Sequence, residues 1–137
     1  MERTFVLLKP DALRRRLVGE IVARMERTGL ELVAARLVRP TRELAERHYG
    51  AEIAERWGPE VREALLRFVC SGPCLATVWE GPDAVARTRE VVGQKPDPRD
   101  CEPGTIRRDL GIDTIEQSRA EGRALENLVY AADGVEA

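Results

Sequence analysis

Long apolar runs, histidines and aromatic residues are all scarce in this sequence of 137 residues, which has one histidine and only 4% aromatic residues. No apolar stretch approaches the roughly 20 residues that a helix needs to span a bilayer. The first residues, Met1 to Leu8, are interrupted too soon by Lys9 and Pro10 to be predicted as a signal sequence. We therefore expect no membrane partner and a cytoplasmic location.

Cysteine pairs with metal-binding or disulfide spacing are also missing. The three cysteines are Cys70, Cys74 and Cys101, and none of them forms a CxxC pair. Their odd number and their spacing disfavour both a disulfide framework and a metal centre built from protein ligands. We expect all three to be packing residues in a reducing compartment.

The two signs of charge are nearly balanced, because the chain has 22 Lys and Arg residues and 24 Asp and Glu residues. The two signs are interleaved along the chain, whereas a nucleic-acid surface concentrates Lys and Arg on one face. We therefore expect no nucleic-acid partner. Apolar residues make up 43% of the chain. This composition and length predict a single domain that spans residues 1–137.

The spacing of apolar residues separates strands from helices along the chain. Continuous apolar runs predict strands, and repeats at i, i+3, i+4 and i+7 predict helices. The predicted strands are 4–8, 31–38, 74–79 and 127–130, and the predicted helices are 18–25, 41–49, 60–68 and 81–92. Three prolines between Gly93 and Gly104 predict a loop. A capping-box pattern at 114–117 predicts a short additional helix, which Gly122 ends.

This order of elements favours an α+β sandwich, with helices on one face of a small antiparallel sheet. The specific arrangement that it suggests is the ferredoxin-like βαββαβ sandwich. By our count the sequence has one strand fewer than that pattern before the proline-rich loop. The fold prediction therefore depends also on the motifs that follow.

Four short motifs occur in a fixed order along the chain. They are Lys9-Pro10-Asp11, Ser71-Gly72-Pro73, the run PGTIR at 103–107 and the run NLVYAAD at 127–133. Each motif alone occurs by chance in many proteins. Together, with the predicted helices between them, they make the chain resemble the nucleoside diphosphate kinases from Glu2 to its C-terminus.

The resemblance implies the ferredoxin-like fold of the nucleoside diphosphate kinase type and a ping-pong phosphotransferase. In that family a histidine takes the γ-phosphate from a nucleoside triphosphate and passes it to a nucleoside diphosphate, with Mg²⁺ bound to the nucleotide. The transferred group spreads negative charge over its oxygens, so catalysis depends on cations and on positioning. Family members are usually hexamers or tetramers, so we also expect a homo-oligomer.

The resemblance assigns phosphate contacts to three cations. Lys9 matches the family lysine that contacts the transferred phosphate, and Arg89 and Arg107 match its phosphate-binding arginines. Arginine suits this role because its planar fork pairs with two oxygens at once. Taken singly, a solvated lysine and surface ion pairs explain these residues better. Because all three fall on motif positions, we favour phosphate binding.

Three further residues fall at positions that the resemblance places in the nucleotide site. Tyr49 matches the active-site tyrosine, and Trp57 matches an aromatic residue that stacks on the nucleobase. Asn127 is the first residue of the nucleophile motif. Two alternatives remain open: Tyr49 packs the end of its helix, and Trp57 covers the core at a helix end.

The nucleophile motif departs from the family pattern, which runs asparagine, two apolar residues, histidine, a small residue, serine and aspartate. Here Tyr130 stands in place of the histidine and Ala132 in place of the serine. The sequence also ends at Ala137, before the family glutamate that orients the imidazole, so we expect that carboxylate to be missing. A phenol with a pKa of about 10 is almost fully protonated at neutral pH. We expect Tyr130 to fill the catalytic position without catalysing transfer.

The sole histidine, His48, matches a non-catalytic position of the family pattern, and we expect it on a helix surface. The preferred hypothesis is therefore a nucleotide-binding pseudoenzyme whose phosphohistidine transfer is impaired or lost. The first alternative is an active phosphotransferase that moves a γ-phosphate from a nucleoside triphosphate to a nucleoside diphosphate. The second alternative is a non-catalytic assembly partner that uses no nucleotide.

Overall fold

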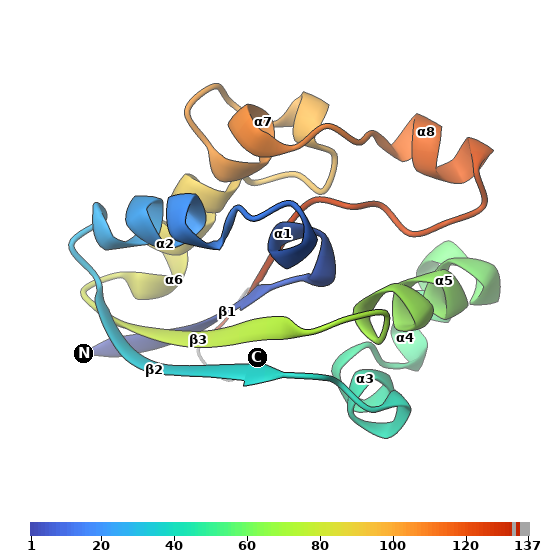
Figure 1. Ribbon diagram of the computed structural model, residues 1–137, viewed down its shortest axis with the longest axis horizontal. Helices are drawn as coiled ribbons and strands as arrows, with labels where there is room; N and C mark the ends of the chain where they lie inside the picture. The colour runs from blue at the N-terminus through green and yellow to red at the C-terminus, as the bar shows by residue number, and fades with distance from the viewer. Residues whose placement is uncertain (133, 135–137) are drawn as a thin grey trace.

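The computed structural model describes residues 1–132 and 134, and it has a four-stranded antiparallel sheet at its centre (Figure 1). The strands are β1 (Glu2–Leu8), β2 (Glu31–Val38), β3 (Cys74–Gly81) and β4 (Val129–Ala131). Their order in the sheet is β2-β3-β1-β4. This topology is the ferredoxin-like α+β arrangement, so the predicted fold class is confirmed.

Helices connect the strands and surround the sheet. They are α1 (Pro10–Arg14), α2 (Val18–Glu26), α3 (Arg42–His48), α4 (Ala51–Trp57), α5 (Pro59–Val69), α6 (Ala84–Val92), α7 (Ile106–Leu110) and α8 (Ile115–Ala120), with a 3-10 turn, η1, at Pro98–Asp100. The sequence predicted α2, α3, α5, α6 and α8, and it missed α1, α4 and α7. Within the described residues, no helix is both long enough and apolar enough to cross a bilayer.

The expectation that the helices lie on one face of the sheet is wrong. Val6 and Leu8 pack on one face together with residues of α2 and α6, whereas Leu7 packs on the other face with residues of α3 and α5. Figure 1 shows α2 and α6 on one side of the sheet and α3 on the other. The reason is that β1 is apolar on both sides of its pleat, so each face needs a cover.

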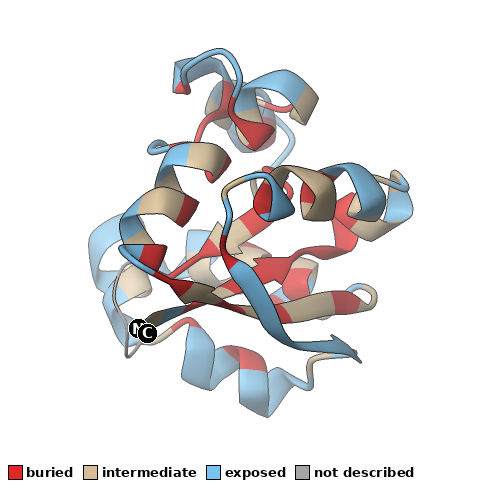
Figure 2. Cartoon of the chain, turned by 90° about the vertical axis from the view of Figure 1, so that its left-hand side faces the viewer, coloured by how far each residue is buried: buried red, intermediate tan, exposed pale blue. Residues whose placement is uncertain are grey.

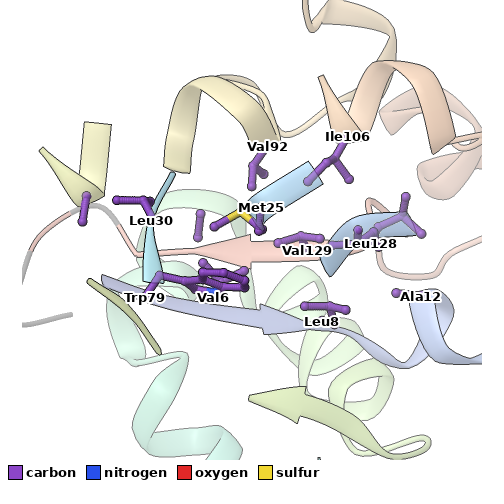
Figure 3. Packing of buried hydrophobic residues seen from close by; sticks show 13 residues of the cluster. Val6, Leu8, Ala12, Met25, Leu30, Trp79, Val92, Ile106, Leu128 and Val129 are labelled. Carbon is purple, nitrogen blue, oxygen red and sulfur yellow. The ribbon is translucent and has the colours of Figure 1, made fainter. Parts of the chain in front are cut away.

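The larger core lies between the sheet and helices α2 and α6 (Figure 3). Trp79 of β3 is its largest fully buried side chain, and Met25 of α2 packs against the same face. The indole Nε1 of Trp79 donates to Thr77 Oγ1 over 2.9 Å, so its one polar atom is satisfied. Figure 2 shows the buried residues concentrated on the sheet and on the helix faces that meet it.

The strand count made from the sequence was also wrong, because the four predicted strands already complete the βαββαβ order. The connection from β2 to β3 contains α3, α4 and α5 in place of a short hairpin. These three helices gather at one end of the sheet (Figure 1). As a result, the segment near residue 48, at the end of α3, lies close to the end of the sheet where β1 ends.

Side-chain caps begin two of the predicted helices. Thr41 Oγ1 accepts the Leu44 amide over 3.1 Å at the start of α3, and Thr114 Oγ1 accepts the Gln117 amide over 3.0 Å at the start of α8. Gly122 follows α8 with a φ of +64°, a left-handed conformation that favours glycine. The additional helix predicted from the capping-box pattern is therefore confirmed.

Candidate functional site

The nucleophile motif reaches the sheet as β4, which pairs with β1. Val129 and Ala131 belong to the larger core, while Tyr130 packs with the smaller core on the opposite face. Successive side chains of a strand point to opposite faces, so this alternation directs residue 130 towards α3 and α5. Asp133, the last residue of the motif, lies outside the described residues.

Aromatic rings surround Tyr130 on this face. Its ring centroid lies 4.5 Å from that of His48, 6.3 Å from that of Phe5 and 6.4 Å from that of Tyr49. Tyr49 itself is buried at the end of α3, and burial raises its phenol pKa far above 10. Tyr49 therefore stays a neutral phenol at physiological pH, close to residue 130.

Two arginines contact the backbone on either side of Tyr130. Arg107 Nη2 donates to the Val129 carbonyl over 2.7 Å. Arg89 Nη1 donates to the Ala131 carbonyl over 3.4 Å. The two guanidinium groups come from α7 and α6, which are separate elements, and they meet at the same short strand.

Lys9 adds a third cation to the same segment. Its amide donates to the Leu128 carbonyl over 2.8 Å, and its ammonium donates to Asn127 Oδ1. Asn127 is held from its other end, because its Nδ2 donates to the Pro96 carbonyl over 2.8 Å. The structure therefore brings the three predicted cations and Asn127 together around residue 130.

Burial and neighbouring charge lower the pKa values of Lys9 and Arg107. Lys9 is buried, and burial lowers its pKa from 10.5 to about 8, with a further contribution from Arg107. Burial also lowers the pKa of Arg107 to about 10, and the neighbouring Arg89 adds to this effect. Nearby Asp11 partly compensates the charge of Lys9. A cluster of like charges in a protein is costly unless an anion joins it.

Arg107 also fixes the proline-rich loop against β4. Its Nη1 donates to the carbonyls of Gly93, over 3.3 Å, and Lys95, over 2.9 Å. Gly93 has a φ of +124°, and a Cβ atom there would come within 2.8 Å of Cys101 Sγ. Only glycine fits this position without strain. Arg107 Nε, in contrast, is buried and has no hydrogen-bond partner among the described residues.

Trp57 ends α4 and is 52% exposed. The Arg56 guanidinium lies 5.1 Å from the centroid of its ring. The alternative that Trp57 covers the core is therefore wrong. An exposed ring remains available for stacking, and the role of Trp57 in nucleobase binding stays a prediction.

His48 was expected on a helix surface, at a non-catalytic position of the family pattern. The residue is exposed, but its ring contacts both Tyr49, at 4.6 Å between centroids, and Tyr130. The contact between α3 and β4 joins residues far apart in the sequence, so periodicity gave no signal of it. The one available signal was the position of His48 next to Tyr49.

The chain is similar to proteins of known activity over almost its whole length. A family model described as nucleoside diphosphate kinase matches residues 2–137. The nucleoside diphosphate kinase of Symbiobacterium thermophilum is 43% identical over 136 residues, covering 99% of this chain and 81% of the relative. That of Thermus thermophilus is 48% identical over 124 residues, covering 90% of this chain and 86% of the relative.

Solved structures show the same similarity. A transition-state mimic of nucleoside-diphosphate kinase from Borrelia burgdorferi, with bound vanadate and ADP, superposes with a TM-score of 0.93 at 32% identity. The match covers 98% of this chain and 80% of that one. An NDP kinase from Pyrobaculum aerophilum superposes with a TM-score of 0.89 at 31% identity, covering 98% of this chain and 90% of that one.

Proposed function

Because the chain belongs to the nucleoside diphosphate kinase family, we propose that it binds nucleoside di- and triphosphates through Lys9, Arg89 and Arg107. The observation that carries this proposal is the meeting of these three cations around residue 130. Nucleotide phosphates supply the anion that the cluster otherwise needs, and their oxygens match the arginine forks. Asn127 and Tyr49 complete the wall of the site.

Mg²⁺ accompanies the nucleotide in this proposal. The described residues hold no group of three or more His, Cys, Asp or Glu side chains that could bind a metal ion by themselves. The phosphate oxygens are suitable hard ligands for Mg²⁺, which commonly binds proteins through substrate phosphates. When bound, the ion neutralises phosphate charge, while the three cations orient the phosphate chain.

Transfer through residue 130 is lost in this proposal, because Tyr130 offers a phenol in place of an imidazole nitrogen. An aryl phosphate ester does not readily transfer its phosphoryl group, whereas a phosphorus–nitrogen bond transfers it readily to another acceptor. The alternative is an active phosphotransferase that moves a γ-phosphate from a nucleoside triphosphate to a nucleoside diphosphate. The names of the relatives and the retained cations favour that alternative.

A transfer assay with labelled ATP and unlabelled GDP separates these two functions. We expect no sustained transfer through residue 130 in the natural chain. Tyr130→His is expected to recover only part of a family member's activity, because Ala132 supplies no hydroxyl group beside the new imidazole. Tyr130→Phe is the matched control.

Two results of this assay would contradict the proposed loss of transfer. The first is sustained turnover by the natural chain that both Lys9→Ala and Tyr130→Phe abolish, which would support an active phosphotransferase that works through residue 130. The second is full family-like activity in Tyr130→His, which would mean that the residues surrounding position 130 are sufficient.

We also propose that the chain forms a homo-oligomer through β2. This strand lies at the edge of the sheet, and almost all of its residues are exposed. Its apolar side chains include Leu37, which is 64% exposed, and Leu32, which is 40% exposed. An exposed apolar edge strand pairs readily with another strand. Sedimentation equilibrium that found only monomer would exclude this proposal.

The alternative of a non-catalytic assembly partner requires, in addition to an oligomer, that no nucleotide binds.

A further inference from the structure

His48 is the only imidazole in the chain, and it lies beside the nucleophile position. It is the last residue of α3, which the β2–β3 connection carries to the face of the sheet where Tyr130 points. The two rings meet at 77° with their centroids 4.5 Å apart. An imidazole therefore stands next to the volume that the family histidine occupies.

We propose that His48 is a phosphoryl acceptor, which takes the γ-phosphoryl group of a bound nucleoside triphosphate in place of the nitrogen missing at position 130. This inference rests on the proposed nucleotide binding. It differs from the family reaction in the element that supplies the nitrogen, since α3 replaces β4. It also gives a chemical role to a residue that the sequence motifs left without one.

The environment of His48 keeps a nitrogen available. Partial burial among the aromatic rings lowers the pKa of His48 below 6.5, and the nearby Lys9 cation lowers it further. The imidazole is therefore mainly neutral at pH 7, with one unprotonated ring nitrogen. The residue also remains exposed, so a ligand can reach it.

Lys9 connects His48 to the group that would hold the phosphates. Its charge acts on His48, and its ammonium is held by Asn127. A phosphoryl group between Lys9 and His48 would face a cation on one side and a nucleophile on the other. This is the pairing that phosphoryl transfer requires, because the cation stabilises charge on the transferred oxygens.

The lone pair of the unprotonated His48 nitrogen attacks the γ-phosphorus, and a nitrogen–phosphorus bond forms. The bond from that phosphorus to the β,γ-bridging oxygen breaks, and its electron pair leaves with the nucleoside diphosphate. The other ring nitrogen releases its proton to water. Phosphohistidine and nucleoside diphosphate are the products.

Packing alone gives a different explanation, in which His48 only fills space beside Tyr130. An edge-to-face contact of this kind contributes about 0.5–1.5 kcal/mol and is open to any aromatic ring. His48→Phe keeps such a contact and removes the nitrogen. This variant therefore separates a packing role from an acceptor role.

The test is to incubate the full chain with ATP labelled at the γ-phosphate and Mg²⁺, and to divide the quenched protein between acid and base. We expect label that is lost in acid and survives base, as a nitrogen–phosphorus bond does. His48→Phe is expected to lose the label, while Tyr130→Phe keeps it. Arg47→Gln is the control, because Arg47 is the preceding residue of α3 and its side chain pairs with Glu43 over 3.0 Å.

Fluorescence titration with a labelled ADP analogue is run on the same samples, so that binding and labelling are judged separately. Binding without any label, or label that survives acid as phosphotyrosine does, would overturn the role of His48 and leave nucleotide binding intact. Acid-labile label that persists in His48→Phe would overturn it as well. A chain that binds no nucleotide would overturn both proposals. The acid lability of the natural chain's label is informative even if His48→Phe fails to fold.

Discussion

Arg107→Met is expected to weaken ADP binding by roughly tenfold to a hundredfold, because each hydrogen bond to a charged group contributes about 1.5–3 kcal/mol. Arg107 is one of the two arginines that contact β4 next to residue 130, and it donates to the Val129 carbonyl over 2.7 Å. Its Nε is buried without a partner among the described residues, so a phosphate oxygen there would satisfy it. Isothermal titration calorimetry with ADP and Mg²⁺ measures the effect.

Two further variants control for loss of structure and loss of charge. Arg108→Met changes the next residue of α7, whose guanidinium donates away from β4 to the Arg99 carbonyl over 2.6 Å, and it should leave the affinity unchanged. Arg107→Lys keeps the charge but loses the planar fork, so its affinity should be intermediate. Unchanged affinity in a folded Arg107→Met would remove this residue from the phosphate site.

The free protein is expected to become more stable as the pH rises from about 8 to 10.5, because the buried Lys9 loses its charge more readily in the folded state. Its pKa is about 8 in the folded state against 10.5 in the unfolded chain, so within this window the unfolded state binds more protons. The free energy of unfolding then rises with pH, by up to about 3 kcal/mol for a shift of this size. Below the folded-state pKa the cost of burying the charge is fully present. Urea unfolding at a series of pH values measures the slope.

Nucleotide binding should change in the opposite direction over the same pH range. A bound phosphate favours the charged form of Lys9, so the affinity for ADP should fall once the pH exceeds about 8. Lys9→Met should flatten both pH profiles. Lys95, the only other lysine, is exposed, and Lys95→Met should leave both unchanged. Identical slopes in the natural chain and in Lys9→Met would show that another group titrates there.

The sequence predicted those elements whose hydrophobic pattern is complete. The helical repeat of Val61, Ala64, Leu65 and Phe68 became part of α5, and the apolar run at the N-terminus became β1. Lys9 and Arg107 could be picked out because each lies in a short motif, and Arg89 because it lies four residues before Gly93. Such features are local, so they can be read without knowledge of the tertiary structure.

The remaining features depend on contacts between distant parts of the chain. Helices α1 and α7 have five residues each, too few for a full apolar repeat. The start of α7 is fixed by Thr105, whose Oγ1 accepts the Arg108 amide over 3.2 Å. The contact of His48 with Tyr130 joins α3 to β4, which are far apart in the sequence. These features follow from tertiary packing, which single-sequence patterns do not specify.

Calorimetric titration of the natural chain with ADP, AMP and adenosine, each with Mg²⁺ present, tests most directly whether the cations around residue 130 form a phosphate-binding site. We expect the affinity to increase from adenosine to AMP to ADP, and added salt to weaken the binding of ADP. Adenosine that binds as tightly as ADP, or the absence of binding by any of the three, would contradict this expectation.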